Sequence, residues 1–226
     1  MEISVMQSIA FKEAYNELVP AFERASGHRV NTQWRPSVEV TQRLKDGDVV
    51  DLTIMASAVV DELISLGRFA QRFDLARSGV AVAVRKGAPK PDISSAEALK
   101  KALLAAKSVA YSTGPSGVYM AGLIEKWGIA PQVTPKATVV TGVPSGGLVA
   151  RGEVELCFQQ MSELLPVEGI DIVGPLPAEI QKTTIFVIGL CAKAPQPAAA
   201  RELVDFLRSK EAQPVIRKWG MEPIAP

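Results

Sequence analysis

Four turns in the sequence carry residue types that could bind an anion. Each turn follows a short apolar stretch, opens a predicted helix and contains serine or glycine. The first turn of a helix has backbone N–H groups without partners and about half a positive charge from the helix dipole, so it binds an oxyanion without Lys or Arg. The turns are Met6-Gln7-Ser8, Arg35-Pro36-Ser37, Gly114-Pro115-Ser116-Gly117 and Gly142-Val143-Pro144-Ser145-Gly146.

A second interpretation of these serines is purely local. Serine is a preferred N-cap residue at any helix start, so each one could serve its own helix alone. However, the turns occur in pairs in the two halves of the chain, and each follows a strand, where open α/β sheets place their ligands. As a set, the four turns therefore predict a binding site for a small anion.

Composition excludes several classes of protein. The chain has 226 residues, a size that suits one large core or two modest lobes, and 47% hydrophobic residues exclude disorder. Its 25 Lys and Arg nearly balance its 24 Asp and Glu, and the charges are scattered, so we expect no nucleic-acid partner. The sequence has no run of 18 apolar residues, so we expect no direct membrane insertion.

The beginning of the chain shows a strand pattern and not the pattern of a signal peptide. We expect a periplasmic protein if a native signal peptide has been removed, and a cytoplasmic protein if Met1 is the native start.

Few residues offer metal or nucleophile chemistry. Cys157 and Cys191 lie in apolar stretches without the spacing of a metal or redox pair, and they are predicted to be buried thiols. His28 is the only histidine, which argues against a His-based metal site and against a Ser-His-Asp triad. We therefore predict no metal and no cofactor, and the sequence identifies no catalytic residue.

Strand and helix signals alternate along the chain, which predicts an α/β fold of two lobes with a mostly parallel mixed sheet. Strands 80–85 and 183–190 are predicted to form a two-strand hinge, and the ligand is expected in a cleft between the lobes. Lobe 1 would comprise 1–80 with 187–226, and lobe 2 would comprise 84–183. The expected strands are 2–6, 29–34, 51–55, 80–85, 108–111, 137–140, 154–158, 170–173 and 183–190; the expected helices are 9–25, 37–46, 58–66, 94–105, 117–127, 145–151, 161–164, 197–208 and 210–219.

The ordered motifs resemble the type II periplasmic binding proteins of the molybdate-binding kind. They run from Met6-Gln7-Ser8-Ile9 through Asp51-Leu52-Thr53-Ile54 and Gly114-Pro115-Ser116-Gly117 to the ending 212–220, so the resemblance spans nearly the whole chain. It implies a tetrahedral oxyanion held by serine hydroxyls and backbone amides, and delivery of that anion to an ABC transporter permease.

The resemblance also implies a ligand set. Ser8 and Ser37 match serines of the family, Ser116 and Gly117 match a small residue with its amide, and Val143 lies near another amide donor. Where the family has a tyrosine, this chain has Gln160. Gln160 is an amide with two donors and an acceptor, and Arg35 could grip a carboxylate bidentately or simply face water. Together they favour a polycarboxylate over a tetrahedral oxyanion.

Three functions remain open at this point. The first is a binding protein for a small oxyanion or polycarboxylate, expected to be a monomer. The second is a cofactor-free enzyme that resembles aconitate isomerase, with Tyr111, Tyr119, Glu39 and Glu163 as candidate proton carriers. The third is a LysR-type effector domain, which the absence of a helix-turn-helix segment before Glu2 disfavours.

Overall fold

The computed structural model describes residues 1–224 and divides the chain into two units. Unit 1 contains residues 1–78 and the chain from Thr184 onward, and unit 2 contains residues 79–183. Two strands, β4 (Phe69–Arg85) and β9 (Thr183–Cys191), carry the chain from one unit into the other. That these strands act as a hinge stays a prediction.

The sheet of unit 1 has the strand order β2-β1-β3-β9-β4. Strand β1 (Glu2–Gln7) is parallel to β2 (Arg29–Trp34) and to β3 (Leu52–Ala56), and β3 is antiparallel to β9. The short strand β10 (Glu222–Pro223) pairs with β4. The carboxyl ends of β1, β2 and β3 therefore point the same way, which brings the turns after them to one edge.

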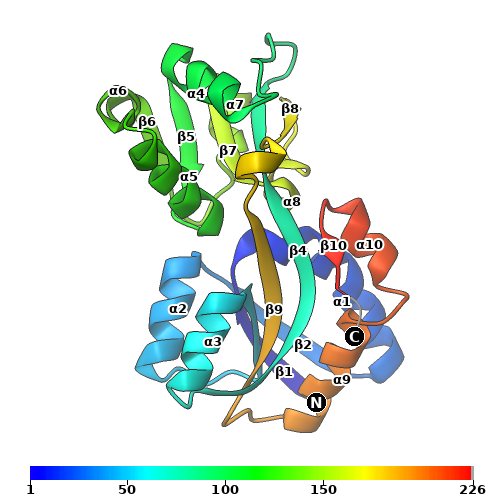
Figure 1. Ribbon diagram of the computed structural model, residues 1–226. Helices are drawn as coiled ribbons and strands as arrows, with labels where there is room; N and C mark the ends of the chain where they lie inside the picture. The colour runs from blue at the N-terminus through cyan, green and yellow to red at the C-terminus, as the bar shows by residue number, and fades with distance from the viewer. Residues whose placement is uncertain (225–226) are drawn as a thin grey trace. The chain divides into compact units, whose positions relative to one another are not determined.

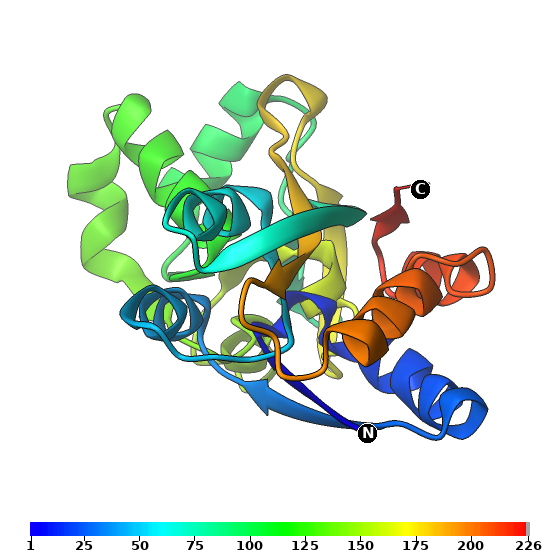
Figure 2. The ribbon, with the colours of Figure 1, turned by 90° about the horizontal axis from the view of Figure 1, so that it is seen from below.

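Helices cover both faces of this sheet (Figures 1 and 2). On one face, α1 (Lys12–Ser26), α9 (Pro197–Leu207) and α10 (Gln213–Lys218) share a core with Phe11, Ile54 and Phe186. On the other face, α2 (Ser37–Asp46) and α3 (Ser57–Ser65) pack on a second core that includes Met6 and Val187. A 3-10 turn, Ile9–Phe11, precedes α1.

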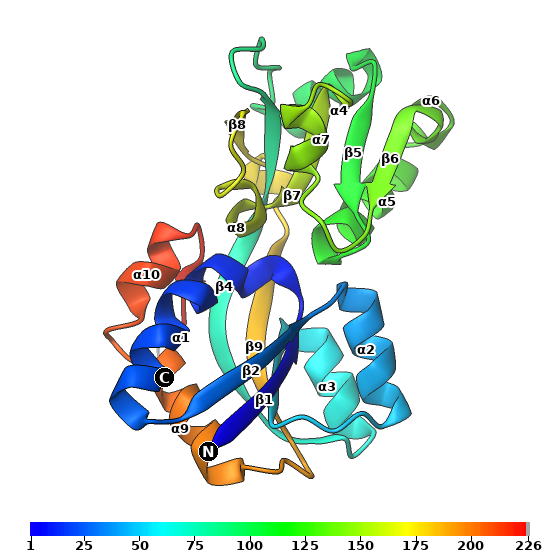
Figure 3. The ribbon, with the colours of Figure 1, turned by 180° about the vertical axis from the view of Figure 1, so that it is seen from behind.

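Unit 2 has the strand order β4-β7-β5-β6, and β8 (Ile170–Pro175) also pairs with β4. Strand β5 (Val109–Ser112) is parallel to β6 (Ala137–Val140) and to β7 (Leu156–Gln160). One face is covered by α4 (Ala96–Ala105), α5 (Pro115–Lys126) and α6 (Ala130–Val133). The other carries α7 (Gly146–Ala150) and α8 (Met161–Leu164) (Figure 3).

The predicted fold class is confirmed, and several element bounds are corrected. Strand β4 begins at Phe69 and not at residue 80, because its first half lacks the regular alternation of buried and exposed side chains that marks a strand in a sequence. Strand β7 spans 156–160 and not 154–158, since Gln159 and Gln160 are polar yet buried. The last helix spans 213–218 and not 210–219, and α6, β10 and the 3-10 turns were not expected.

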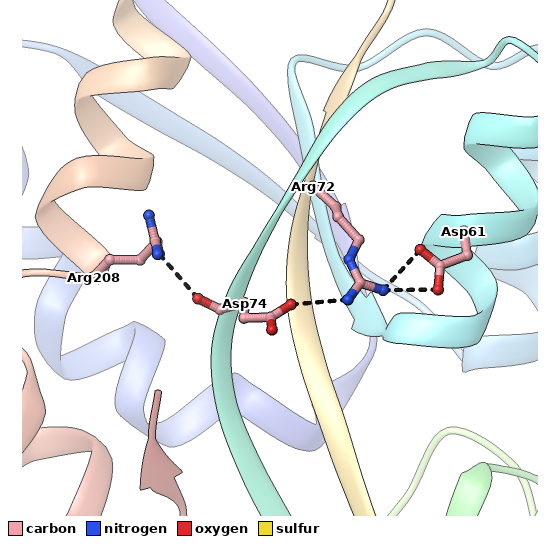
Figure 4. Close-up of polar contacts among 4 residues, drawn as sticks. All are labelled: Asp61, Arg72, Asp74 and Arg208. Carbon is pink, nitrogen blue, oxygen red and sulfur yellow. Dashed lines mark hydrogen bonds and ion pairs between the residues drawn. The ribbon is translucent and has the colours of Figure 1, made fainter. Parts of the chain in front are cut away.

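Polar contacts attach the irregular first half of β4 to its neighbours (Figure 4). The Arg72 guanidinium lies 2.7 Å from both carboxylate oxygens of Asp61 on α3 and 3.2 Å from Asp74. Arg208, just after α9, donates to the backbone oxygen of Asp74 at 2.9 Å. These contacts link β4 to helices on both faces of unit 1.

Two further expectations concern apolar stretches. Among residues 1–224, no helix combines the length and apolar character that crossing a bilayer requires. Cys157 and Cys191 are buried thiols, as predicted, and burial raises the pKa of Cys157 to about 12.

Candidate anion-binding site

In unit 1, the structure brings two of the predicted turns together. Gln7 pairs with Trp34 in the register of β1 and β2, and the Arg35 N–H donates to the Gln7 carbonyl oxygen at 3.1 Å. The Thr53 hydroxyl on β3 donates to the Met6 carbonyl at 2.5 Å. The turn with Ser8 and the turn with Ser37 are therefore neighbours at the carboxyl ends of parallel strands.

Neither Ser8 nor Ser37 uses its hydroxyl as a helix cap. Ser8 occupies the N-cap position of the 3-10 turn in an extended conformation, without a capping hydrogen bond. Ser37 is the first residue of α2, and Pro36 holds the N-cap position. Ser95, by contrast, caps α4 by accepting the Ala98 N–H at 3.1 Å. The local interpretation of serine fits Ser95 and does not account for Ser8 or Ser37.

Arg35 lies two residues before the first residue of α2, and its side chain is exposed. Its Nε is 3.7 Å from Glu39, and both side chains are nearly half exposed, so the pair adds little stability. Glu39, one of the candidate proton carriers, is also 3.9 Å from Arg43. Its carboxylate is thus held between two guanidinium groups, which suits a surface ion pair.

In unit 2, the remaining turns are also neighbours. The Thr113 N–H donates to the Val140 carbonyl at 2.9 Å, which joins the turn after β5 to the turn after β6. The backbone N–H and the hydroxyl of Ser145 donate to Gln159 Oε1 at 2.5 and 2.8 Å, which joins the turn after β6 to the end of β7. Three parallel strands thus end at one edge of unit 2.

The predicted ligand residues Ser116, Gly117 and Val143 have different surroundings. Ser116 lies in the first turn of α5, is 1% exposed, and its hydroxyl has no hydrogen-bond partner among the described residues. Gly117 packs so closely on β5 that a Cβ would lie 1.5 Å from the Ser112 carbonyl oxygen. Val143 is 53% exposed. Packing explains why residue 117 is glycine, while its role toward a ligand stays a prediction.

Gln160 is the last residue of β7 and the N-cap residue of α8, and it is buried. Three positions later, Glu163 accepts hydrogen bonds from the Gln160 backbone N–H and the Gln159 side chain, the arrangement of half a capping box. Burial raises the pKa of Glu163 to about 7 against these two hydrogen bonds, which lower it. With this pKa, the Glu163 carboxyl group changes charge near neutral pH, and it contacts the backbone of the predicted ligand residue Gln160.

Sequence reasoning missed Gln7 and Ser162 as candidates. Gln7 is fully buried, and neither its Nε2 nor its Oε1 has a hydrogen-bond partner among the described residues. The Ser162 hydroxyl is also buried and also has no hydrogen-bond partner among these residues. Such atoms are rare in folded proteins because losing water without gaining a partner costs about 1–3 kcal/mol each. For Gln7 a signal existed, since a glutamine directly follows the apolar run of β1 and precedes Ser8.

Two other candidates are engaged in packing. The Tyr119 hydroxyl donates to the Ile180 carbonyl at 2.6 Å, and Tyr111 packs in the core under α5. Burial is the main cause that raises the pKa of both phenols.

Cavities of about 260 and 430 Å³ in unit 2 lie beside α4, and the smaller one touches Leu156, at the opposite end of β7 from Gln160. These cavities do not include the predicted ligand residues.

The model of the bacterial extracellular solute-binding proteins matches residues 3–222. The chain belongs to this family. The solute-binding family predicted from the sequence motifs is thereby confirmed, and the likeness to molybdate-binding proteins is one of fold. Among curated proteins, an aconitate isomerase from Pseudomonas sp is 38% identical over 230 residues, which cover 98% of this chain and 88% of that protein.

Solved structures share the fold at low identity. The periplasmic molybdate-binding protein of Azotobacter vinelandii superposes with a TM-score of 0.81 at 17% identity, over 99% of both chains. The sulfate-binding protein SubI of Mycobacterium tuberculosis H37Rv has a TM-score of 0.79 at 18% identity, over 100% of this chain and 88% of that one. A tungstate-binding protein of Desulfovibrio alaskensis G20 has a TM-score of 0.71 at 12% identity, over 100% and 99%.

Proposed function

We propose that this solute-binding protein binds a small polycarboxylate anion at the strand ends that carry Ser8, Ser37, Ser116 and Gln160. The observation that carries the proposal is that Gln7, Ser116 and Ser162, which are among these residues or next to them in the sequence, have buried polar side-chain atoms without a partner in residues 1–224. An oxyanion that accepts several hydrogen bonds would satisfy the donors among them.

Residue chemistry and the curated relative support a polycarboxylate over a molybdate-like oxyanion. Gln160 stands where the resemblance expects a tyrosine, and an amide offers an acceptor as well as donors. Arg35 is exposed in the turn that precedes α2, where its planar guanidinium can bind a carboxylate bidentately. The relative that is 38% identical is named for aconitate, a tricarboxylate.

The full proposed ligand set combines hydroxyls, backbone amides and two longer side chains. We further propose that the protein is a periplasmic monomer that delivers this anion to an ABC transporter permease. The proposed ligand residues are Ser8, Arg35, Ser37, Ser116, Gly117, Val143 and Gln160.

Calorimetry with molybdate, tungstate, sulfate, citrate and trans-aconitate tests the ligand class. We expect a polycarboxylate to bind at least about tenfold more tightly than molybdate, a difference of about 1.4 kcal/mol that one charge-assisted contact can supply. Arg35→Ala should remove most of this preference. Arg29→Ala is the matched control, because Arg29 is an exposed arginine at the start of β2, the strand that precedes Arg35. It should not change the affinity for any of the anions.

Two results would contradict this proposal in different ways. If molybdate binds most tightly and Arg35→Ala has no effect, the protein is an oxyanion receptor of the plain molybdate-binding type. If none of the five anions binds, the strand ends do not form an anion site.

A second candidate function is isomerisation of a small tricarboxylic acid. The 38% identity to an aconitate isomerase favours it, and so does Glu163, whose pKa of about 7 allows it to take up and return a proton near neutral pH. In such a reaction a base removes a proton from the methylene carbon next to a carboxylate, the double bond shifts by one carbon, and the proton is returned at the far end of the allylic system.

Incubation with cis-aconitate, followed by NMR, tests this second candidate. We expect the trans isomer to accumulate, and we expect Glu163→Gln to abolish turnover while citrate still binds. The glutamine side chain can keep the hydrogen bond to the Gln160 N–H, so the helix start should persist. Tight binding of cis-aconitate without turnover would leave a receptor and no enzyme.

A further inference from the structure

Gln7 occupies a position where the fold alone favours an apolar side chain. Along β1, Ile3 and Val5 are buried in the core that α1 and α9 cover, and Gln7 continues this alternate series at the end of the strand. Its side chain is 0% exposed, and both polar atoms lack a hydrogen-bond partner among the described residues. A residue of this kind weakens the fold, so its presence calls for another explanation.

The surroundings of Gln7 point to a ligand. Ser8 follows Gln7 directly in the sequence. The Gln7 carbonyl oxygen accepts the Arg35 N–H at 3.1 Å, so two proposed ligand residues are joined to Gln7, one by a peptide bond and one by a hydrogen bond. Two other proposed ligand residues, Ser116 and Gln160, are also buried.

We propose that Gln7 is a specificity residue that recognises a hydroxylated polycarboxylate. Its Nε2 donates to a carboxylate oxygen of the ligand, and its Oε1 accepts a hydrogen bond from a hydroxyl of the same ligand. The inference rests on the proposed function and narrows its substrate class.

The requirement for a hydroxyl follows from the two unpaired atoms. Fully ionised molybdate and simple polycarboxylates only accept hydrogen bonds, so they would satisfy Nε2 and leave Oε1 unpaired. Sites with buried polar groups discriminate strongly against an analogue that lacks the matching group. Citrate and propane-1,2,3-tricarboxylate form a matched pair for this purpose, because they differ only in the hydroxyl.

The variant Gln7→Met tests the assignment, since methionine has a similar length and no hydrogen-bonding amide. We expect wild-type protein to bind citrate at least about tenfold more tightly than propane-1,2,3-tricarboxylate, and Gln7→Met to bind the two equally. Without ligand, Gln7→Met should raise the Tm by about 2–4 °C or more, because an unpaired buried amide has been removed.

Gln159→Met is the matched control for stability. Gln159 is also a buried strand glutamine, but its Oε1 accepts both the backbone N–H and the hydroxyl of Ser145. The same substitution should therefore lower the Tm at position 159 and raise it at position 7.

The outcomes separate this inference from the proposed function. If wild-type protein binds none of citrate, propane-1,2,3-tricarboxylate and trans-aconitate, the proposed function fails, and the inference fails with it. If wild-type protein binds citrate and Gln7→Met keeps both its affinity and its preference, only the role of Gln7 is wrong. A lower Tm of ligand-free Gln7→Met would show a structural role for the amide and would also overturn the inference.

Discussion

Local geometry strongly limits substitution at Gly117. A Cβ there would lie 1.5 Å from the Ser112 carbonyl oxygen, which is backbone and has little freedom to move. We expect Gly117→Ala to lower the free energy of unfolding by more than about 3 kcal/mol, the range of severe overpacking, as measured by urea unfolding.

A second glycine of the same helix is the control for Gly117. Gly122 is exposed on α5, and a Cβ there would meet nothing within 4 Å. Gly122→Ala should therefore raise the free energy of unfolding by about 0.5–1 kcal/mol through helix propensity. A mild effect at position 117 would show that α5 can shift away from β5.

Glu163 makes stability depend on pH in an unusual direction for a carboxyl group. Burial raises its pKa from 4.5 to about 7, so between these values the folded protein keeps a proton that the unfolded chain releases. The contribution of protonated Glu163 to the free energy of unfolding is fully present below about pH 4.5 and is lost as the pH rises through about 7. We expect Glu163→Gln to be more stable than wild-type protein at pH 8, and this gain to shrink at pH 5.

Urea unfolding at the two pH values measures this effect, with Glu168→Gln as the control. Glu168 is exposed, a few residues further along the chain. An equal response of both variants to pH would mean that Glu163 titrates like a surface carboxyl group.

At the same scale, some of the proposed ligand residues could be predicted from the sequence and others could not. Ser8, Ser37 and Ser116 could be predicted because serine after a strand is visible in the sequence, and the structure places them at strand ends. Ser162 could not be predicted, and Gln7 had only its place between the apolar run of β1 and Ser8 as a signal, because only the structure shows that their polar atoms have no partner among the described residues.

At the scale of elements, substitution by alanine should affect stability at one helix-start serine and ligand affinity at another. Ser95 caps α4 through the Ala98 N–H, so Ser95→Ala should lower the free energy of unfolding by about 1 kcal/mol and leave ligand affinity unchanged. Ser8 makes no capping bond. Ser8→Ala should hardly change stability and should weaken ligand binding by about 1–3 kcal/mol, and Ser37→Ala should do the same.

Thermal unfolding and calorimetry on the same variants measure this contrast. A loss of stability in Ser8→Ala as large as that in Ser95→Ala, with affinity preserved, would restore the purely local interpretation of Ser8.

Element bounds could be predicted where the pattern of side chains is regular. The alternation of strands and helices was correct in order, including the short helix 161–164. The first half of β4 could not be predicted, because contacts distant in sequence, such as Arg72 with Asp61 and Arg208 with Asp74, accompany its irregular pattern. The end of β7 was missed because buried glutamines resemble a loop in a sequence.

At the scale of the whole molecule, unit 2 has the features of a domain that folds alone. It has its own cores on both faces of its strands. Its two ends are joined, since the Gln181 side chain accepts the Val80 N–H and donates to the Val80 carbonyl, both at 3.0 Å. We expect a fragment of residues 79–183 to unfold cooperatively in urea, as followed by circular dichroism.

Gln181→Ala tests the closure of this fragment. It should lower the fragment's stability by about 1–3 kcal/mol, because both backbone groups of Val80 lose their partner. A fragment without a cooperative transition would mean that unit 2 depends on the rest of the chain.

The amide of Gln181 has a consequence for how such a protein could be re-engineered. Because both of its hydrogen bonds are made to Val80, the contact that joins the two ends of unit 2 lies entirely within residues 79–183. Exchanging residues 79–183 for the equivalent segment of a relative would then replace half of the proposed ligand groups in a single step. Specificity could in this way be recombined between receptors without redesigning the remaining scaffold.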